Sequence, residues 1–146
     1  DREINTTNEL KAIKLLARLY ANLGKHAKAT GACKEGLELD KFDPECYYLQ
    51  GLLFVEEGDR GSAEKSFFRA IYLQPDFELA HYAMANSCLE RADKKKALRH
   101  FNNAALILRS VPAEKEIPCA EDMSAGRLLQ IIDSILNNID QHEKAS

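Results

Sequence analysis

The sequence predicts an all-α fold, and its composition is the first observation behind that prediction. The 146-residue chain contains 19 Ala and 19 Leu, which form helices readily, against 2 Val, 9 Ile and 3 Thr, which are β-branched. With 7 Gly and 4 Pro, it has too few turn residues for a β-sandwich or β-barrel. A predominantly β fold is therefore excluded.

The second observation is an internal repeat. Sliding the sequence against itself by 34 residues brings three segments into register, beginning at Leu10, Pro44 and Glu78. Six columns then match in size and polarity: Ala17, Gly51 and Ala85; Tyr20, Phe54 and Cys88; Gly24, Gly58 and Ala92; Ala29, Ala63 and Ala97; Cys33, Phe67 and Phe101; Gly36, Ala70 and Ala104. We therefore expect repeats at about residues 10–43, 44–77 and 78–110.

Each repeat is predicted to contain two antiparallel helices. Asp43 and Asp76 lie beside prolines at the starts of the second and third repeats, where a short acidic side chain accepts hydrogen bonds from first-turn amides. Gly24 and Gly58 fall where the first helices of their repeats should end, in the left-handed conformation.

Close packing of the helices explains why small residues recur at some of the aligned positions. Two paired helices must approach closely, and a large side chain at Ala17, Gly51 or Ala85 would hold them apart. The rings of Phe67 and Phe101 are then expected to fill the space beside the small residues.

The chain after the repeats divides into a linker and a final helix. Residues 111–123 contain two prolines and no hydrophobic period, which indicates a linker. Ser124 is predicted to cap a helix over residues 124–140, with Leu128, Ile132, Ile135 and Ile139 on one face. Such a stripe must be buried, and the nearest apolar surface is the end of the last repeat.

This pattern is identified as the tetratricopeptide repeat (TPR). The second repeat carries the expected aromatic, small and proline positions: Tyr47, Gly51, Phe54, Ala63, Phe67, Ala70 and Pro75. The third repeat has His81 in place of the first aromatic residue, and the first repeat matches least. The resemblance implies a single domain, residues 1–146, folded as a superhelix of three helix-turn-helix repeats with a C-terminal capping helix.

The resemblance also implies a binding surface, because the first helices of TPR repeats line a concave groove. The expected groove residues in this chain are Lys11, Lys14, Arg18, Tyr48, Leu52, Tyr82 and Asn86. Such a groove is basic at its N-terminal end and aromatic or apolar in its middle, which suits a peptide with apolar anchors and an acidic end. Tyr48 and Tyr82 are one repeat apart and are expected to stack as a ladder facing the ligand.

Less specific interpretations of these residues stay open. The two tyrosines could simply pad helix contacts, and the three basic residues could form a solvated helix face. The clamp by which chaperone-binding TPRs hold a C-terminal carboxylate is disfavoured, because its positions here are Lys14, Arg18, Leu49, Leu79 and Ala83. Only two of these can bind a carboxylate.

Bulk properties exclude other classes of function. A net charge of −3 gives no reason to expect nucleic-acid binding, and no apolar run approaches the roughly 20 residues needed for membrane insertion. The cysteines at 33, 46, 88 and 119 include no Cys-x-x-Cys pair, so we expect no metal site and a reducing, cytoplasmic compartment. The histidines are far apart, and the glycines are too isolated to form a phosphate loop. We expect no catalytic residue and no cofactor.

A narrower resemblance covers residues 69–77, 80–82, 96–101 and 122–129. These segments are similar to the C-terminal TPR region of CheR-type bacterial chemotaxis-receptor methyltransferases, including a proline-bearing linker and a Ser-Ala-Gly-Arg-Leu helix start. The S-adenosylmethionine-binding catalytic domain is absent from this chain. The resemblance implies a regulatory or targeting domain of a protein-glutamate O-methyltransferase.

The expected function is therefore non-catalytic protein–protein recognition. The partner would be a protein or peptide segment, from a receptor, a signalling protein or the methyltransferase's own catalytic domain. A free-standing TPR adaptor of an unrelated pathway and a self-association module are the alternatives. The oligomeric state does not follow from the sequence.

Overall fold

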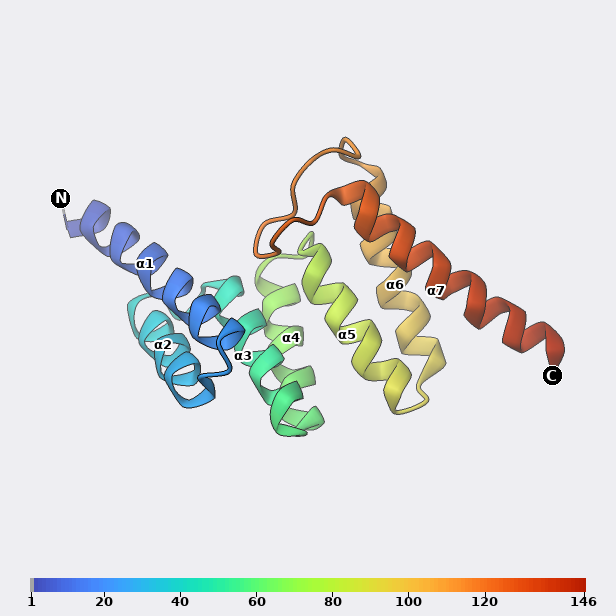
Figure 1. Ribbon diagram of the computed structural model, residues 1–146, viewed down its shortest axis with the longest axis horizontal. Coiled ribbons are helices and arrows are strands. Elements are labelled where there is room, and N and C mark those ends of the chain that lie inside the picture. Colours follow the sequence, from blue (N-terminus) through green and yellow to red (C-terminus); the bar gives the residue numbers. More distant parts are fainter. Residues whose placement is uncertain (1) are drawn as a thin grey trace. The chain divides into compact units, whose positions relative to one another are not determined.

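The computed structural model describes residues 2–146. Over this range the chain forms seven α-helices and no strand, which confirms the predicted all-α class (Figure 1). The helices gather into two compact units, one ending at Pro75 and the other beginning at Asp76.

Unit 1 contains the first four helices. They are α1 (Arg2–Asn22), α2 (His26–Leu39), α3 (Pro44–Glu57) and α4 (Arg60–Leu73). Helix α1 packs on α2 and α3 packs on α4, and α2 and α3 also touch. Consecutive helices are thus paired, as expected for helix-turn-helix repeats.

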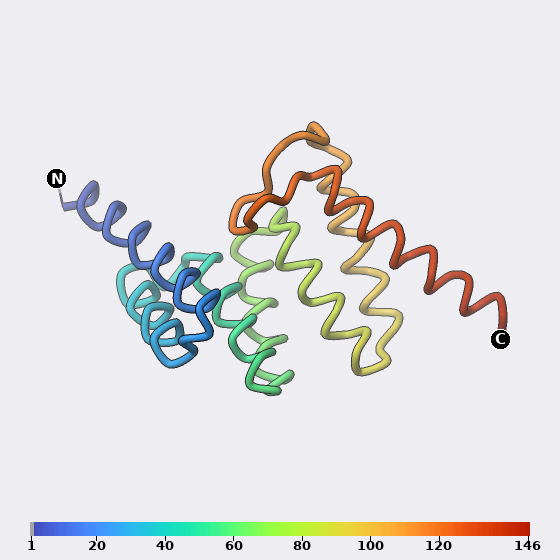
Figure 2. The backbone as a smooth tube through the Cα atoms, viewed as in Figure 1, coloured from blue at the N-terminus to red at the C-terminus, as the bar shows by residue number. Residues whose placement is uncertain are grey.

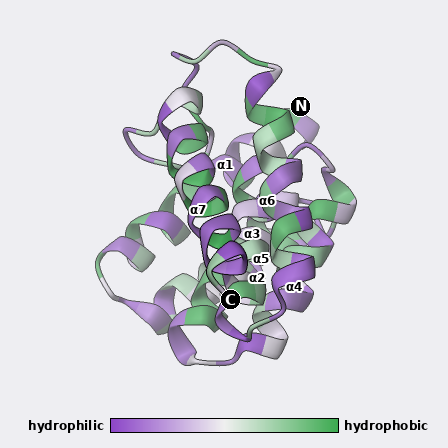
Figure 3. Cartoon of the chain, turned by 90° about the vertical axis from the view of Figure 1, so that its right-hand side faces the viewer, coloured by the Kyte–Doolittle hydropathy of each residue, from purple (hydrophilic) through white to green (hydrophobic). Residues whose placement is uncertain are grey.

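Unit 2 contains one further pair and the C-terminal helix. Helices α5 (Glu78–Glu90) and α6 (Lys94–Arg109) pack on each other, and α7 (Ala125–Ala145) lies against α6. Leu128, Ile132 and Ile139 of the predicted apolar stripe on α7 are buried, whereas Ile135 is half-buried. Figure 3 shows that the helices carry both hydrophobic and hydrophilic residues.

The connection from α6 to α7 is partly ordered by backbone pairing. Residues Glu116 and Ser124 form an isolated β-bridge, and Ile117 between them is buried. Figure 2 shows this segment passing near the beginning of α5 before α7 starts. The linker therefore contributes a side chain to the core of unit 2.

Two predicted helix caps form as expected. The Asp43 carboxylate accepts a hydrogen bond from the Cys46 amide at 2.9 Å, and the Ser124 hydroxyl accepts one from the Arg127 amide at 3.2 Å. Each satisfies an amide that has no partner within its helix.

The predicted cap at Asp76 is wrong. Helix α5 is preceded by Phe77, which forms no side-chain cap, so Asp76 lies one residue outside the capping position. Phe77 is buried at this position, with only 3% of its surface exposed. The second helices α4 and α6 have acidic caps that were not predicted: Asp59 accepts from the Ser62 amide and Asp93 from the Lys96 amide, whereas α2 follows Lys25 and has no side-chain cap.

The helix ends also differ from expectation at both termini. Helix α1 begins at Arg2, ahead of the first repeat at Leu10, and α7 extends to Ala145 past the expected end at residue 140. Neither extension contains Pro or Gly, so nothing in the local sequence ends the helix earlier.

Helices α3 and α4 approach each other closely at Gly51. A β-carbon added there would lie 2.6 Å from Cδ1 of Phe67 and closer still to Cε1 of the same ring. Phe67 and Phe101, at the same position of successive repeats, are both completely buried. The predicted packing of a large ring beside a small residue is therefore present in α3 and α4.

In the third repeat the residue aligned with Gly24 and Gly58 is Ala92, and it has the same left-handed backbone conformation. The φ angles are 72° at Gly24, 79° at Gly58 and 63° at Ala92. A left-handed conformation is easy for Gly but costs an L-residue such as Ala roughly 1–2 kcal/mol.

We expect Ala92→Gly to raise the free energy of unfolding by about 0.5–1 kcal/mol, because relief of this strain exceeds the added freedom of the unfolded chain. Urea unfolding monitored by circular dichroism measures the change. The matched control is Gly58→Ala, which has open space around it and should lose stability by a similar amount. Loss of stability in Ala92→Gly would contradict the interpretation.

Candidate functional site

The basic residues predicted for the groove are already paired within unit 1. The Lys14 ammonium lies 2.9 Å from Oδ2 of Asp43 and 3.2 Å from Oε2 of Glu45. Nε of Arg18 lies 3.6 Å from Oε1 of Glu45. Two cations on α1 thus face two carboxylates at the start of α3, and their charges balance.

The pKa of Lys14 also reflects its pairing with Asp43 and Glu45. Burial alone would lower its pKa, but the hydrogen bond that Lys14 donates to Asp43 and the negative charge of Glu45 outweigh that effect and raise the pKa above its ordinary value. Lys14 therefore stays charged and ties α1 to α3. Lys11, by contrast, is exposed and forms no ion pair with any residue from 2 to 146.

The two predicted tyrosines contact the phenylalanine of their own repeat. The ring centroids of Tyr48 and Phe67 are 6.2 Å apart, and those of Tyr82 and Phe101 are 6.1 Å apart with an edge-on arrangement. Tyr48 is only 7% exposed, whereas Tyr82 is half-buried. The tyrosines belong to different units, so their stacking as a ladder stays a prediction.

The remaining predicted groove residues occupy equivalent positions one repeat apart. Leu52 on α3 and Asn86 on α5 are both half-buried, so part of each side chain is accessible. Tyr82 is half-buried as well, and the role of these three residues in a groove stays a prediction.

Three histidines, His26, His81 and His100, take part in side-chain contacts. Nε2 of His26 lies 2.6 Å from a Glu57 carboxylate oxygen, and this hydrogen bond is the main cause of a raised His26 pKa. Nδ1 of His81 lies 3.2 Å from Nδ1 of His100, inside unit 2. His81 is buried, in agreement with its predicted place at a packing position.

The cysteines behave as small apolar side chains. Cys33, Cys46 and Cys88 are buried, and burial raises the pKa of the Cys33 thiol to about 11. Burial also raises the pKa of Cys46 strongly, with the Asp43 charge adding to the effect. Protonated thiols are poor nucleophiles and metal ligands, and residues 2–146 contain no group of three or more potential ligand side chains.

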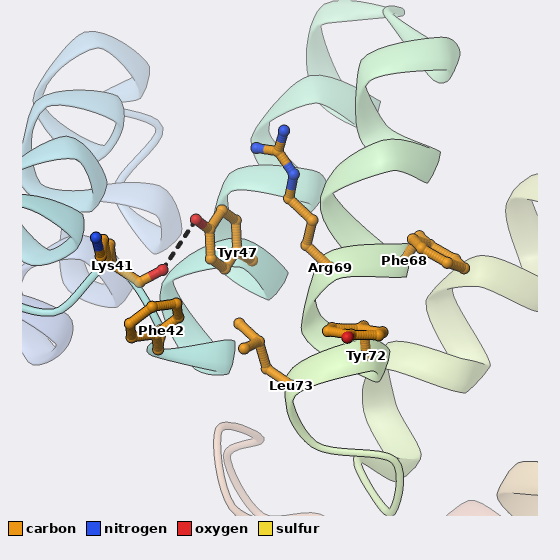
Figure 4. A pocket seen from close by; sticks show the side chains of 7 residues that line it. All are labelled: Lys41, Phe42, Tyr47, Phe68, Arg69, Tyr72 and Leu73. Carbon is orange, nitrogen blue, oxygen red and sulfur yellow. Dashed lines mark hydrogen bonds between the residues drawn. The ribbon is translucent and has the colours of Figure 1, made fainter.

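A pocket on unit 1 was not anticipated from the sequence. Its cavity is about 450 Å³, and the elements that form it are the turn before α3, the start of α3 and the second half of α4. We call it the aromatic pocket, lined chiefly by Lys41, Phe42, Tyr47, Phe68, Arg69 and Tyr72 (Figure 4). The signal that could have revealed it is Phe68, because the other repeats have Lys34 and Asn102 at that position.

Comparison with known families identifies the helix pair that carries this pocket. The tetratricopeptide repeat family model matches residues 44–77. This segment is a tetratricopeptide repeat. It contains α3 and α4 with the Gly51–Phe67 contact, so the sequence pattern and the packing describe the same unit.

A curated relative extends the similarity along the chain. Tetratricopeptide repeat protein 37 of Xenopus laevis is 27% identical over 130 residues, which is 86% of this chain. The chain spans only 8% of the length of that relative. The similarity therefore concerns repeats within a much longer protein.

Solved structures show the TPR type of fold. The type III secretion translocator chaperone SycD of Yersinia enterocolitica superposes with a TM-score of 0.79, 17% identity, and coverage of 94% of this chain and 88% of SycD. The first TPR of Spaghetti (RPAP3), bound to the HSP90 peptide SRMEEVD, has a TM-score of 0.65, 14% identity, and coverage of 89% and 94%. At these identities the likeness is one of fold.

Helical repeats of this class bind partners through extended surfaces. The TPR fold thus supports an interaction domain. None of the helices in residues 2–146 combines the length and apolarity needed to cross a membrane.

Proposed function

We propose that this chain is a non-catalytic recognition domain that binds a protein or peptide segment along the first helices of its repeats. The observation that carries the proposal is the recurrence of accessible side chains one repeat apart, with Leu52 on α3 and Asn86 on α5. The partly exposed Tyr82 adds an aromatic anchor. Tyrosine supplies a large contact area, which makes it a frequent hot spot in interfaces.

The groove residues divide into two roles in this proposal. Tyr82, Leu52 and Asn86 contact the ligand, and the exposed Lys11 attracts its acidic end. Lys14, Arg18 and Tyr48 shape the surface, because the first two are paired with carboxylates and Tyr48 is packed on Phe67. The internal pairing of Lys14 and Arg18 also supports the prediction against a carboxylate clamp.

The proposal is tested with an array of short peptides of randomised sequence. Peptides captured by the wild-type chain should bind Tyr82→Ala about 2 kcal/mol more weakly, roughly thirtyfold in Kd, because a central aromatic anchor is lost. Leu52→Ala should weaken the same peptides. Leu106→Ala is the control, because Leu106 is exposed on the second helix of its repeat. Unchanged binding in both groove variants, with helical circular dichroism intact, would refute the assignment.

We further propose that the domain is the C-terminal region of a cytoplasmic CheR-type methyltransferase in chemosensory signalling. The support is the Ser124–Leu129 motif, which has a defined place at the start of α7. Ser124 caps the helix, and a β-carbon on Gly126 would lie 3.0 Å from that of Ala113, so glycine fits where the linker folds back.

The alternative is a TPR adaptor from an unrelated pathway, which the similarity to the long Xenopus protein favours. The genomic reading frame upstream of Asp1 discriminates between them. A methyltransferase domain in that frame supports the chemosensory proposal, whereas further TPR repeats support the adaptor.

A further inference from the structure

The aromatic pocket exposes rings that the repeat itself does not require. Phe42 is 64% exposed, Phe68 is 62% exposed and Tyr72 is 77% exposed. Phe67, next to Phe68, is completely buried and serves the core of the same helix pair. Isolated exposed apolar residues are common on protein surfaces, but several around one cavity mark a binding surface.

The other repeats do not have aromatic residues at the positions of Phe68 and Tyr72. The position of Phe68 is occupied by Lys34 in the first repeat and by Asn102 in the third, both exposed. The position of Tyr72 is occupied by Glu38 in the first repeat and by Leu106, which is 70% exposed, in the third. Helix pairs therefore form without aromatic residues at these places, and packing within the repeat does not explain the rings.

The aromatic pocket could hold one apolar side chain between its rings, and we call this space the socket. In Figure 4, Phe42 and Tyr72 lie on opposite sides, with Tyr47 and Leu73 between them. Tyr47 and Leu73 are only half-buried, so the base of the socket is apolar and reachable. The Tyr47 hydroxyl donates a hydrogen bond to the Lys41 carbonyl oxygen at 3.0 Å, which fixes the ring at the base.

Two cations border the socket without any carboxylate partner. The Lys41 ammonium lies 5.2 Å from the Phe42 ring centre, and the Arg69 guanidinium lies 5.6 Å from that of Tyr47. Neither forms an ion pair with any residue from 2 to 146. The nearby Asp40 carboxylate instead accepts a hydrogen bond from the Phe42 amide. The border therefore carries positive charge that an acidic ligand would complement.

We propose that the aromatic pocket binds an acidic protein segment that inserts one aromatic or large aliphatic side chain between Phe42 and Tyr72. Carboxylates flanking that side chain pair with Lys41 and Arg69. This second recognition surface adds to the proposed peptide-binding role, and it uses none of the groove residues. The two proposals can therefore fail separately.

Three synthetic pentapeptides test the proposal against the full chain. Asp-Asp-Trp-Asp-Asp should bind and shift the backbone amide resonances of residues 41–47 and 68–73 in NMR titrations. Lys-Lys-Trp-Lys-Lys lacks the charge, and Asp-Asp-Ala-Asp-Asp lacks the anchor. Both should bind about tenfold or more weakly.

Variants of exposed residues complete the test. Phe68→Asn introduces the residue found at this position in the third repeat, so it should fold normally and weaken the acidic tryptophan peptide about tenfold. Arg69→Glu should weaken that peptide and strengthen the basic one. Leu106→Ala is the control, since this residue is 70% exposed on α6 and outside the pocket. The groove variant Tyr82→Ala should also leave binding unchanged.

Two results would overturn the proposal. One is equal binding of the acidic and basic tryptophan peptides, because charge would then play no part. The other is a wild-type dimer in sedimentation that Phe68→Asn dissociates while the acidic peptide fails to bind. The rings would then form a contact between two copies of the chain.

Discussion

Replacing Phe67 by alanine is expected to lower the free energy of unfolding by about 3–5 kcal/mol. The ring is completely buried, contacts the Tyr48 ring and fills the space that Gly51 leaves between α3 and α4. Removing it leaves a cavity that neither Gly51 nor the surrounding alanines can fill. Urea unfolding followed by circular dichroism measures the loss as a lower midpoint with an unchanged slope.

The neighbouring residue provides a matched control. Phe68→Ala removes the same atoms from the same helix, but from a ring that is 62% exposed, and should change stability by no more than about 0.5 kcal/mol. Equal losses for the two variants would mean that both rings pack in the interior, and would contradict the assignment of Phe68 to a binding pocket.

The second large effect is expected for Ile132→Ala, which should cost about 2–5 kcal/mol. Ile132 is fully buried on α7, which packs against α6. If α7 completes the core of unit 2, this loss should also speed amide hydrogen exchange in α6. NMR-detected exchange at the buried Phe101 and Ala104 of α6 measures it.

Ile131→Ala is the control for the capping helix. It removes the same atoms at a half-buried position and should cost clearly less, about 1 kcal/mol. An Ile132→Ala variant with normal stability and unchanged exchange in α6 would show that α7 is an arm without a structural role.

The fold could be predicted because its main determinants recur at a fixed spacing. Small residues at the close contacts, such as Gly51 and Ala85, and large ones beside them, such as Phe67 and Phe101, are visible in the sequence as columns. Local chemistry also allowed the caps at Asp43 and Ser124 to be predicted. The prediction failed at Asp76, because the buried Phe77, which has no capping side chain, occupies the position directly before α5.

The candidate site was less accessible to prediction. Placing Lys14 and Arg18 on the first helix of their repeat did not reveal that Asp43 and Glu45, on either side of the boundary with the next repeat, would pair with them. Periodicity gives the face of a helix on which a residue lies. It does not give the side chain that comes to meet that residue from another helix.

The sequence alone therefore determined the helix pairs of this protein and the spacing residues between them, because these depend on local propensity and on a repeated pattern of side-chain size. Only the tertiary structure decided which charges are available and which rings are exposed. The charge of Lys14 is matched by Asp43, a residue distant in the sequence, and the pocket combines Phe42 before α3 with Tyr72 on α4. The availability of a charge or a ring depends on neighbours that the folded chain brings together, and these neighbours follow no periodic pattern.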